Sequence, residues 1–249
     1  MSALAGKVAL VTGAGRNIGR AIALHLARDG AAIAVNGRSD RAAVDDVVAE
    51  ITASGGTACA VMGDVGIPED AAHIVAEAAA GLGGLDILVC NAGLRRQTPF
   101  VQMSFAEWRE ILGVALDGAF LMAQAAVPHM IARGGGSIVA LSGISTHVGT
   151  PNRCHVSASK AGLEGLMRAL AVELAGEGIR CNCVAPGSID TARGASAGAR
   201  PSGGAVDKVP LRRFGSVDDI AATVRMLAGP EGGYITGQTI HVNGGAFLT

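Results

Sequence analysis

Aromatic side chains are scarce in this chain of 249 residues, with one Trp, one Tyr and five Phe making up 3% of the total. Proteins that bind single-stranded nucleic acid stack bases on exposed aromatic rings, and this chain has too few for such a platform. An excess of charge is also lacking, because 20 Lys and Arg face 21 Asp and Glu, for a formal net charge of −1. A nearly neutral chain has no general attraction for nucleic acid or for an anionic membrane. We therefore expect neither among the partners.

Paired cysteines and targeting signals are also missing. The five cysteines are odd in number and scattered, and no Cys-x-x-Cys or Cys/His spacing predicts zinc, so we expect no metal. The first residues pass directly into an apolar strand pattern, without the basic and apolar regions of a signal peptide. No apolar run reaches the length of a membrane span. Free thiols and these absences together predict a cytoplasmic protein.

Alternating apolar patterns fill the chain. Short apolar runs predict strands, and amphipathic stretches between them predict helices. The predicted strands are residues 7–12, 32–36, 57–62, 85–90, 137–141, 179–184 and 238–242, and the helices are about 18–26, 40–54, 68–82, 104–130, 153–176 and 216–227. This uninterrupted alternation predicts an α/β fold with one doubly wound parallel sheet. Only residues 191–208, rich in small side chains, break the rhythm; they predict a flexible loop, either a flap or ordinary surface.

A glycine turn, Thr12–Gly19, joins the first strand to the first helix. Glycines there allow backbone N–H groups and the helix N-terminus to approach a pyrophosphate. The pair Gly13 and Gly19 would be a weak signal alone, but its position between strand and helix strengthens it. Further motifs then follow the later strands in order: Asp64-Val65, Asn91-Ala92-Gly93, Lys160, Pro186-Gly187-Ser188-Ile189-Asp190-Thr191 and Asn243-Gly244-Gly245.

This ordered set, which covers essentially the whole chain, resembles the short-chain dehydrogenase/reductase family. The resemblance implies a single Rossmann-type domain over residues 1–249 that binds a nicotinamide dinucleotide. It departs from the family at Asn17, where a glycine is usual; Asn tolerates left-handed backbone, so we expect the turn to survive. The resemblance, together with the residues that follow the second strand, predicts these cofactor contacts: Gly13, Gly15, Arg16, Asn17, Ile18, Gly19, Arg38, Ser39, Asp64, Val65, Asn91, Ala92, Gly93, Lys160, Pro186, Gly187, Ile189 and Thr191.

The end of the second strand predicts which dinucleotide binds. An acidic residue there would bond both ribose hydroxyls and repel a 2′-phosphate. The chain instead has Asn36-Gly37-Arg38-Ser39, without a carboxylate. Arg38 offers a planar fork for phosphate, and Arg16 in the glycine turn is placed to clamp it from the other side. Although both could be ordinary surface arginines, their joint placement favours NADP(H) over NAD(H).

The catalytic side of the resemblance is incomplete. The family has a Tyr four residues before the Lys as general acid/base, a Ser thirteen residues before that Tyr, and an Asn in the helix after the fourth strand. Here these places hold Val156, Gly143 and Ala115, and only Lys160 remains. None of the three side chains present can donate or accept a proton.

Polar residues near the empty positions offer replacements. His147 lies in the loop after the fifth strand, where the family places substrate contacts, and a histidine suits proton transfer near neutral pH. His155 is rotated by about 100° on the helix from Val156, which disfavours it unless the helix begins later. Ser145 lies in the same loop, and Arg153 precedes Val156 by about one turn. For His147, a role as a loop or interface residue is as well supported as a catalytic role. For His155, the non-catalytic role is slightly favoured.

These observations leave three functional hypotheses open. The first is an NADP(H)-dependent oxidoreductase with a non-standard active site, acting on a small carbonyl or conjugated substrate. Arg95 and Arg96 suggest that the substrate is an anion, although Arg96 is as easily a surface residue. The others are a catalytically silent NADP-binding protein and a non-redox lyase or isomerase on the same scaffold. The family resemblance, and the small and apolar residues on several faces of helices 104–130 and 153–176, predict a homotetramer.

Overall fold

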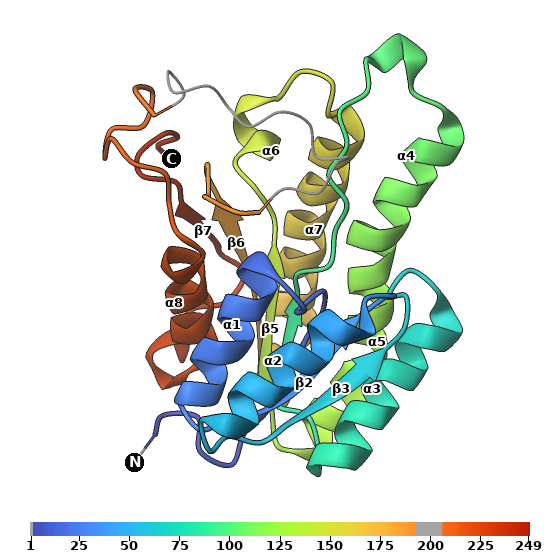
Figure 1. Ribbon diagram of the computed structural model, residues 1–249, viewed down its shortest axis with the longest axis vertical. Helices are drawn as coiled ribbons and strands as arrows, with labels where there is room; N and C mark the ends of the chain where they lie inside the picture. Colours follow the sequence, from blue (N-terminus) through green and yellow to red (C-terminus); the bar gives the residue numbers. More distant parts are fainter. Residues whose placement is uncertain (1, 193–205) are drawn as a thin grey trace.

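Seven parallel strands form one sheet in the computed structural model, which describes residues 2–192 and 206–249 (Figure 1). The spatial order is β3-β2-β1-β4-β5-β6-β7, so the predicted doubly wound parallel sheet is confirmed. The order reverses between β1 and β4, and in such sheets ligands bind outside the carboxyl ends of the strands at that reversal. The strands are β1 (Val8–Val11), β2 (Ala32–Gly37), β3 (Ala58–Met62), β4 (Ile87–Cys90), β5 (Gly136–Leu141), β6 (Ile179–Pro186) and β7 (Thr239–Val242).

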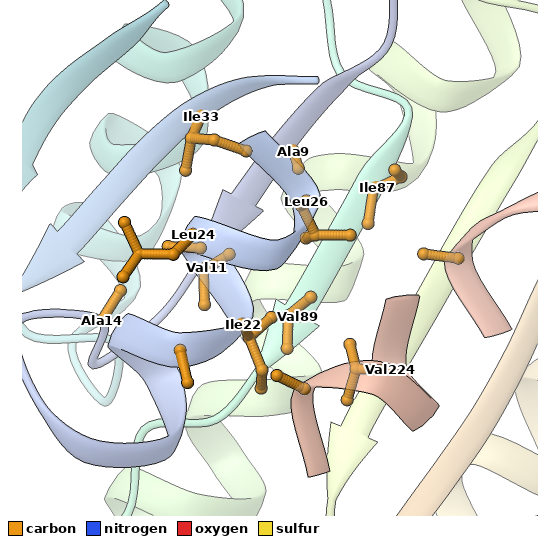
Figure 2. Packing of buried hydrophobic residues seen from close by; sticks show 14 of the residues in the cluster. Ala9, Val11, Ala14, Ile22, Leu24, Leu26, Ile33, Ile87, Val89 and Val224 are labelled. Atoms are coloured by element: carbon orange, nitrogen blue, oxygen red, sulfur yellow. The ribbon is translucent and has the colours of Figure 1, made fainter. Parts of the chain in front are cut away.

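Helices cover both faces of the sheet, which is why its strands are almost continuously apolar. One buried cluster joins Val11, Val35 and Val89 to helices α1 (Asn17–Arg28), α2 (Arg41–Ala53) and α8 (Val217–Ala228). Figure 2 shows this side, with Ile22 and Leu26 of α1 and Val224 of α8 packed near the strands. Alternate strand residues point the other way, into a second cluster with α3 (Pro68–Leu82), α5 (Gly118–Ala132) and α7 (Cys154–Glu173).

Local signals in the sequence explain where helices begin. Ser216 and Asp219 form a capping box at the start of α8, and the Asp40 side chain accepts the Ala43 N–H before α2. Pro68 occupies the first turn of α3, where its missing N–H costs no hydrogen bond. Ser104 caps α4 (Phe105–Leu112) by accepting the Glu107 N–H.

The long helix expected over residues 104–130 is not one regular helix. A five-residue π-helical segment, Gly113–Asp117, separates α4 from α5. At its end, a side chain on Gly118 would lie 2.8 Å from Val65 Cγ2, so only glycine fits this approach. The whole stretch Phe105–Ala132 is long and apolar enough to cross a membrane by length and composition, which the sequence pattern did not predict. It packs against α3 and α7 as a core helix does.

The loop after β5 lies near the carboxyl ends of the strands, where the site is built. The loop after β5 contains a short helix that the sequence did not predict, α6 (Ser145–Val148). Of the flexible loop predicted at about 191–208, residues 193–205 lie outside the described residues.

Candidate cofactor and active site

The glycine turn after β1 is tight against the loop after β4. Gly13 has a positive φ of 60°, and a side chain on it would meet Ala92 Cα at 3.1 Å. A side chain on Gly19 would lie 2.4 Å from the Gly13 carbonyl oxygen, so α1 can begin this close to the turn only with glycine there. Asn17 adopts the left-handed backbone expected of it, at φ 51°.

Neighbouring polar side chains brace this turn. The Asn91 amide donates to the carbonyls of Thr12 and Gly13 at 2.9 and 3.0 Å. Thr12 Oγ1 accepts the N–H groups of Asn91 and Ala92, each at 3.0 Å. The Asn36 side chain accepts the Gly13 N–H and donates to Val61 at 3.2 Å. Thr12 and Asn36 were absent from the predicted site residues, because their roles arise only where β1, β2 and β4 lie side by side.

Asn17 also ties the turn to the segment after β6. Its side chain donates to the Ala192 carbonyl and accepts the Ala192 N–H, both at 3.0 Å. These two hydrogen bonds bring Thr191, a predicted cofactor contact, towards the turn. Pro186 and Gly187 lie on the sheet side of this segment, where a side chain on Gly187 would lie 2.7 Å from Asn243.

A cation stands at the carboxyl end of β2. Arg38 Nη1 lies 3.5 Å from Asp64 Oδ2, and 52% of the Arg38 side chain is exposed. Asp64 is itself fixed, because its Oδ1 accepts the Gly66 N–H at 3.0 Å. The side chains of Arg16, in the glycine turn, and of Ser39, next to Arg38 in sequence, are exposed, while Val65 is buried. Asp64 thus orients Arg38 beside the place where an acidic residue would otherwise stand.

Lys160 extends from α7 towards the crevice between β4 and β5. Its Nζ donates to the Leu141 carbonyl at 2.6 Å and lies 3.4 Å from where a side chain on Gly93 would begin. Desolvation lowers the Lys160 pKa to about 8, and the charge of Arg95 adds to this effect. Burial conversely raises the pKa of the neighbouring Cys90 and Cys183 thiols to about 12. Both cysteines are therefore neutral and leave Lys160 as the ionisable group here.

The three positions at which the family resemblance predicted missing proton-transfer groups lie on three different segments. Val156 is buried one turn before Lys160, and Ala115 is buried in the π-helical segment. A side chain added to Gly143 would meet only one atom within 4 Å, Ser145 Oγ at 3.8 Å. The Ser145 hydroxyl therefore borders an open space at position 143.

His155 contacts α4. It is fully buried in the first turn of α7, and its Nε2 lies 3.1 Å from Glu107 Oε1 on α4. Glu107 also accepts the Thr98 hydroxyl at 2.6 Å, and these contacts lower its pKa, with Thr98 contributing most. The pair joins α7 to α4.

His147 takes part in a different network. Its Nε2 lies 3.1 Å from Oε1 of Glu164, a buried carboxylate on α7 that also accepts Ser142 Oγ at 2.7 Å. Its ring packs against those of His241 and Phe247, with centroids 4.7 and 5.0 Å away. Sequence reasoning missed Glu164, because a glutamate within an amphipathic helix looks like an exposed residue until α6 is seen to cover it.

Two arginines that the sequence placed near the substrate, Arg96 and Arg153, lie on different segments. Arg96 and Glu110 form a two-point ion pair, with Nη2 to Oε1 at 2.9 Å, which directs Arg96 to α4. Arg153 is the residue just before α7 begins. Within the described part of the chain, no three His, Cys, Asp or Glu side chains gather as a metal site would require.

Comparison with known proteins agrees with this architecture. Residues 13–246 match a family model described as enoyl-(acyl carrier protein) reductase. A 3-oxoacyl-[acyl-carrier-protein] reductase of Staphylococcus aureus is 40% identical over 242 residues, 97% of this chain and 98% of the relative.

Two solved structures give the same result. A short-chain dehydrogenase from Burkholderia cenocepacia in complex with NADP is 37% identical, with a TM-score of 0.90, and the match covers 98% of this chain and 99% of the other. A 7α-hydroxysteroid dehydrogenase complexed with NADH is 33% identical, with a TM-score of 0.92 and coverage of 97% and 94%. The chain belongs to the short-chain dehydrogenase/reductase family.

Proposed function

We propose that the protein is an NADP(H)-dependent oxidoreductase whose proton transfer uses a non-standard set of side chains. The observation that carries the proposal is a contrast within one site. The cofactor side has a braced glycine turn, an oriented Arg38 and a partly desolvated Lys160. The positions of the usual proton-transfer groups hold Val156, Gly143 and Ala115. The five cysteines of the protein are free, in keeping with a proposed cytoplasmic location.

The cofactor assignment depends on Arg38 more than on the fold, because relatives of this fold hold either NADP or NADH. A guanidinium suits a phosphate through paired charge-assisted hydrogen bonds. In the proposed complex Arg38 and Arg16 hold the 2′-phosphate, and the N-terminus of α1 holds the pyrophosphate. Lys160 holds the nicotinamide ribose. The bound dinucleotide supplies the hydride.

Ser145 and His147 are the proposed replacements on the substrate side. The Ser145 hydroxyl borders the open space at Gly143, so it is placed to donate a hydrogen bond to a carbonyl there. His147 is 24% exposed at its side chain, whereas the His155 side chain is fully buried against Glu107. In reduction of a ketone, the bound dinucleotide would supply the hydride to the carbonyl carbon, and the His147 imidazolium would give its proton to the oxygen. Water then returns a proton to the imidazole, and Arg153 orients an anionic substrate.

Oxidation of NADPH in the presence of acetoacetyl-coenzyme A and crotonyl-coenzyme A tests this function. These probes contain the keto and conjugated groups suggested by the relatives' names. We expect slow turnover, because loss of a positioned general acid costs about 10²–10⁴-fold in rate. His147→Ala should abolish turnover yet retain NADPH binding, and the wild-type rate should fall towards high pH, where a histidine loses the proton it donates. His73→Ala, on the exposed side of α3, is the matched control. Full activity of His147→Ala would reject this proton donor.

A silent NADP-binding protein is the second candidate. It is favoured by one observation, namely that His147 and His155 are both engaged with carboxylates. The double substitution Val156→Tyr with Gly143→Ser separates the two functions, since position 143 has room for a side chain. If the wild type turns over neither probe and the double variant does, the natural protein is the silent binder.

A further inference from the structure

A buried carboxylate near the middle of α7 has no role in the function proposed so far. Glu164 is only 5% exposed and lies two turns after Val156, beside the apolar residues Leu163 and Met167. Burying an ionised carboxylate is costly unless hydrogen-bond donors compensate for the lost water. A buried carboxylate at this position therefore needs partners that stabilise its charge.

Donor groups converge on one oxygen of this carboxylate. Glu164 Oε1 lies 2.7 Å from Ser142 Oγ and 3.1 Å from His147 Nε2. Thr146 Oγ1 lies 3.2 Å away, but its single hydrogen is shared with the Gly143 carbonyl at 3.0 Å. An ionised carboxylate can only accept hydrogen bonds, so the His147 nitrogen facing it must carry a hydrogen. With Glu164 ionised, Nε2 would keep its proton, and Nδ1 would be the atom that gains and loses one.

The other sides of the His147 ring are also occupied. His241 of β7 meets it edge to face, and Phe247 of the C-terminal segment stacks on it. The titratable groups facing His147 are thus Glu164 from α7 and His241 from β7, and behind Glu164 lies Cys183 of β6, near Lys160 and Arg168. Burial, followed by the charge of His147, lowers the pKa of His241. The lowered pKa of His241 favours its neutral form beside His147.

We propose that Glu164 is the positioning residue of the proton step, holding His147 in the Nε2–H tautomer and stabilising its imidazolium so that Nδ1 delivers the proton. A carboxylate performs this task for the histidine of hydrolytic triads. The inference rests on the proposed function, since it assigns His147 as the donor. In this proposal the pKa and orientation of His147 are set by Glu164, a buried group of α7 that does not touch substrate.

Imidazole nitrogen NMR over a pH titration tests the assignment without any substrate. In the wild-type protein we expect His147 in the Nε2–H tautomer. Glu164→Gln keeps the shape and removes the charge, so the His147 pKa should fall by about 1–3 pH units, the usual effect of an adjacent opposite charge. Glu173→Gln, an exposed position on the same helix, should leave it unchanged. An unchanged tautomer and pKa in Glu164→Gln would overturn the inference, whatever the activity.

A second variant keeps the test decisive if Glu164→Gln does not fold. Ser142→Ala takes one donor from the carboxylate and leaves its charge for His147, so the His147 pKa should rise. A constant or lower pKa would count against the inference.

The pH dependence of NADPH oxidation with acetoacetyl-coenzyme A supplies the functional readout. Its limb should move with the His147 pKa in each variant, with kcat reduced and KM for NADPH unchanged. A limb that stays while the NMR pKa moves would remove His147 from the reaction, and the positioning role with it. That outcome would reject the proposed donor, whereas an unmoved NMR pKa would reject Glu164 alone.

Discussion

Removal of the Arg38 guanidinium should reveal the cofactor preference. Arg38 follows β2 and is oriented by Asp64, its Nη1 3.5 Å from Asp64 Oδ2. The segment Asn36–Ser39 has no carboxylate of its own, so in the proposed complex no acidic side chain takes the place of the 2′-phosphate, and Arg38 and Arg16 face it. Arg38→Ala therefore removes attraction for NADPH and leaves the site for NADH untouched.

The size of the effect follows from the exposure of the side chain. Hydrogen bonds to charged groups contribute about 1.5–3 kcal/mol. Because 52% of Arg38 is exposed, we expect the low end, about 1.5–2 kcal/mol, since solvent screens part of the interaction. This corresponds to a rise of about 10–30-fold in Kd for NADPH.

Titration calorimetry with NADPH and NADH measures both affinities. Arg41→Ala is the matched control, because Arg41 is also exposed but is paired with Asp45 on α2. It should change neither affinity. Equal affinities of the wild type for the two dinucleotides, or an unchanged NADPH affinity in Arg38→Ala, would refute the argument.

Three further outcomes are expected. Gly19→Ala should abolish NADPH binding in calorimetry, because its side chain would lie 2.4 Å from the Gly13 carbonyl, whereas Gly165→Ala, with open space around it, should bind normally. Asp86→Asn should cost about 3 kcal/mol in chemical denaturation, as when a buried ion pair loses one partner. Burial raises the Asp86 pKa, but hydrogen bonds from the Val8 N–H, Lys7 and Arg133 outweigh this and lower it. Its contribution to stability is therefore present above the unfolded pKa of about 3.9 and lost as the pH falls through the lower folded value, a loss that Asp86→Asn should not show. Light scattering should give a tetramer mass, since Phe105, Phe120 and Val172 are exposed on α4, α5 and α7; a monomer mass at micromolar concentration would contradict this.

The fold was predictable because its signals are local. Val11 and Leu10 belong to one short apolar run, yet they enter opposite clusters, as expected for a strand covered on both faces. The turn at Gly13–Gly19 was equally readable. The π-helical segment at 113–117 was not, because one wider turn barely changes an apolar period.

The candidate site was predictable only where it depends on one element. The azimuth of His155 follows from helix geometry, and α7 does begin before it, at Cys154. Its partner Glu107 lies 48 residues away in sequence, so only the packing of α4 on α7 reveals the pair. Glu164 is the clearest case, since its burial depends on α6, a helix of four residues with no sequence signal of its own.

Transfer of deuterium from C4-deuterated NADPH tests the central proposal, that the protein transfers hydride with Val156 at the position that the family resemblance assigns to a tyrosine. The protein is incubated with each C4 stereoisomer and acetoacetyl-coenzyme A, and the product is examined by mass spectrometry. We predict deuterium on the former carbonyl carbon from one stereoisomer only, and none with His147→Ala. A protein that binds NADPH but gives no labelled product from this probe or from crotonyl-coenzyme A would contradict the claim.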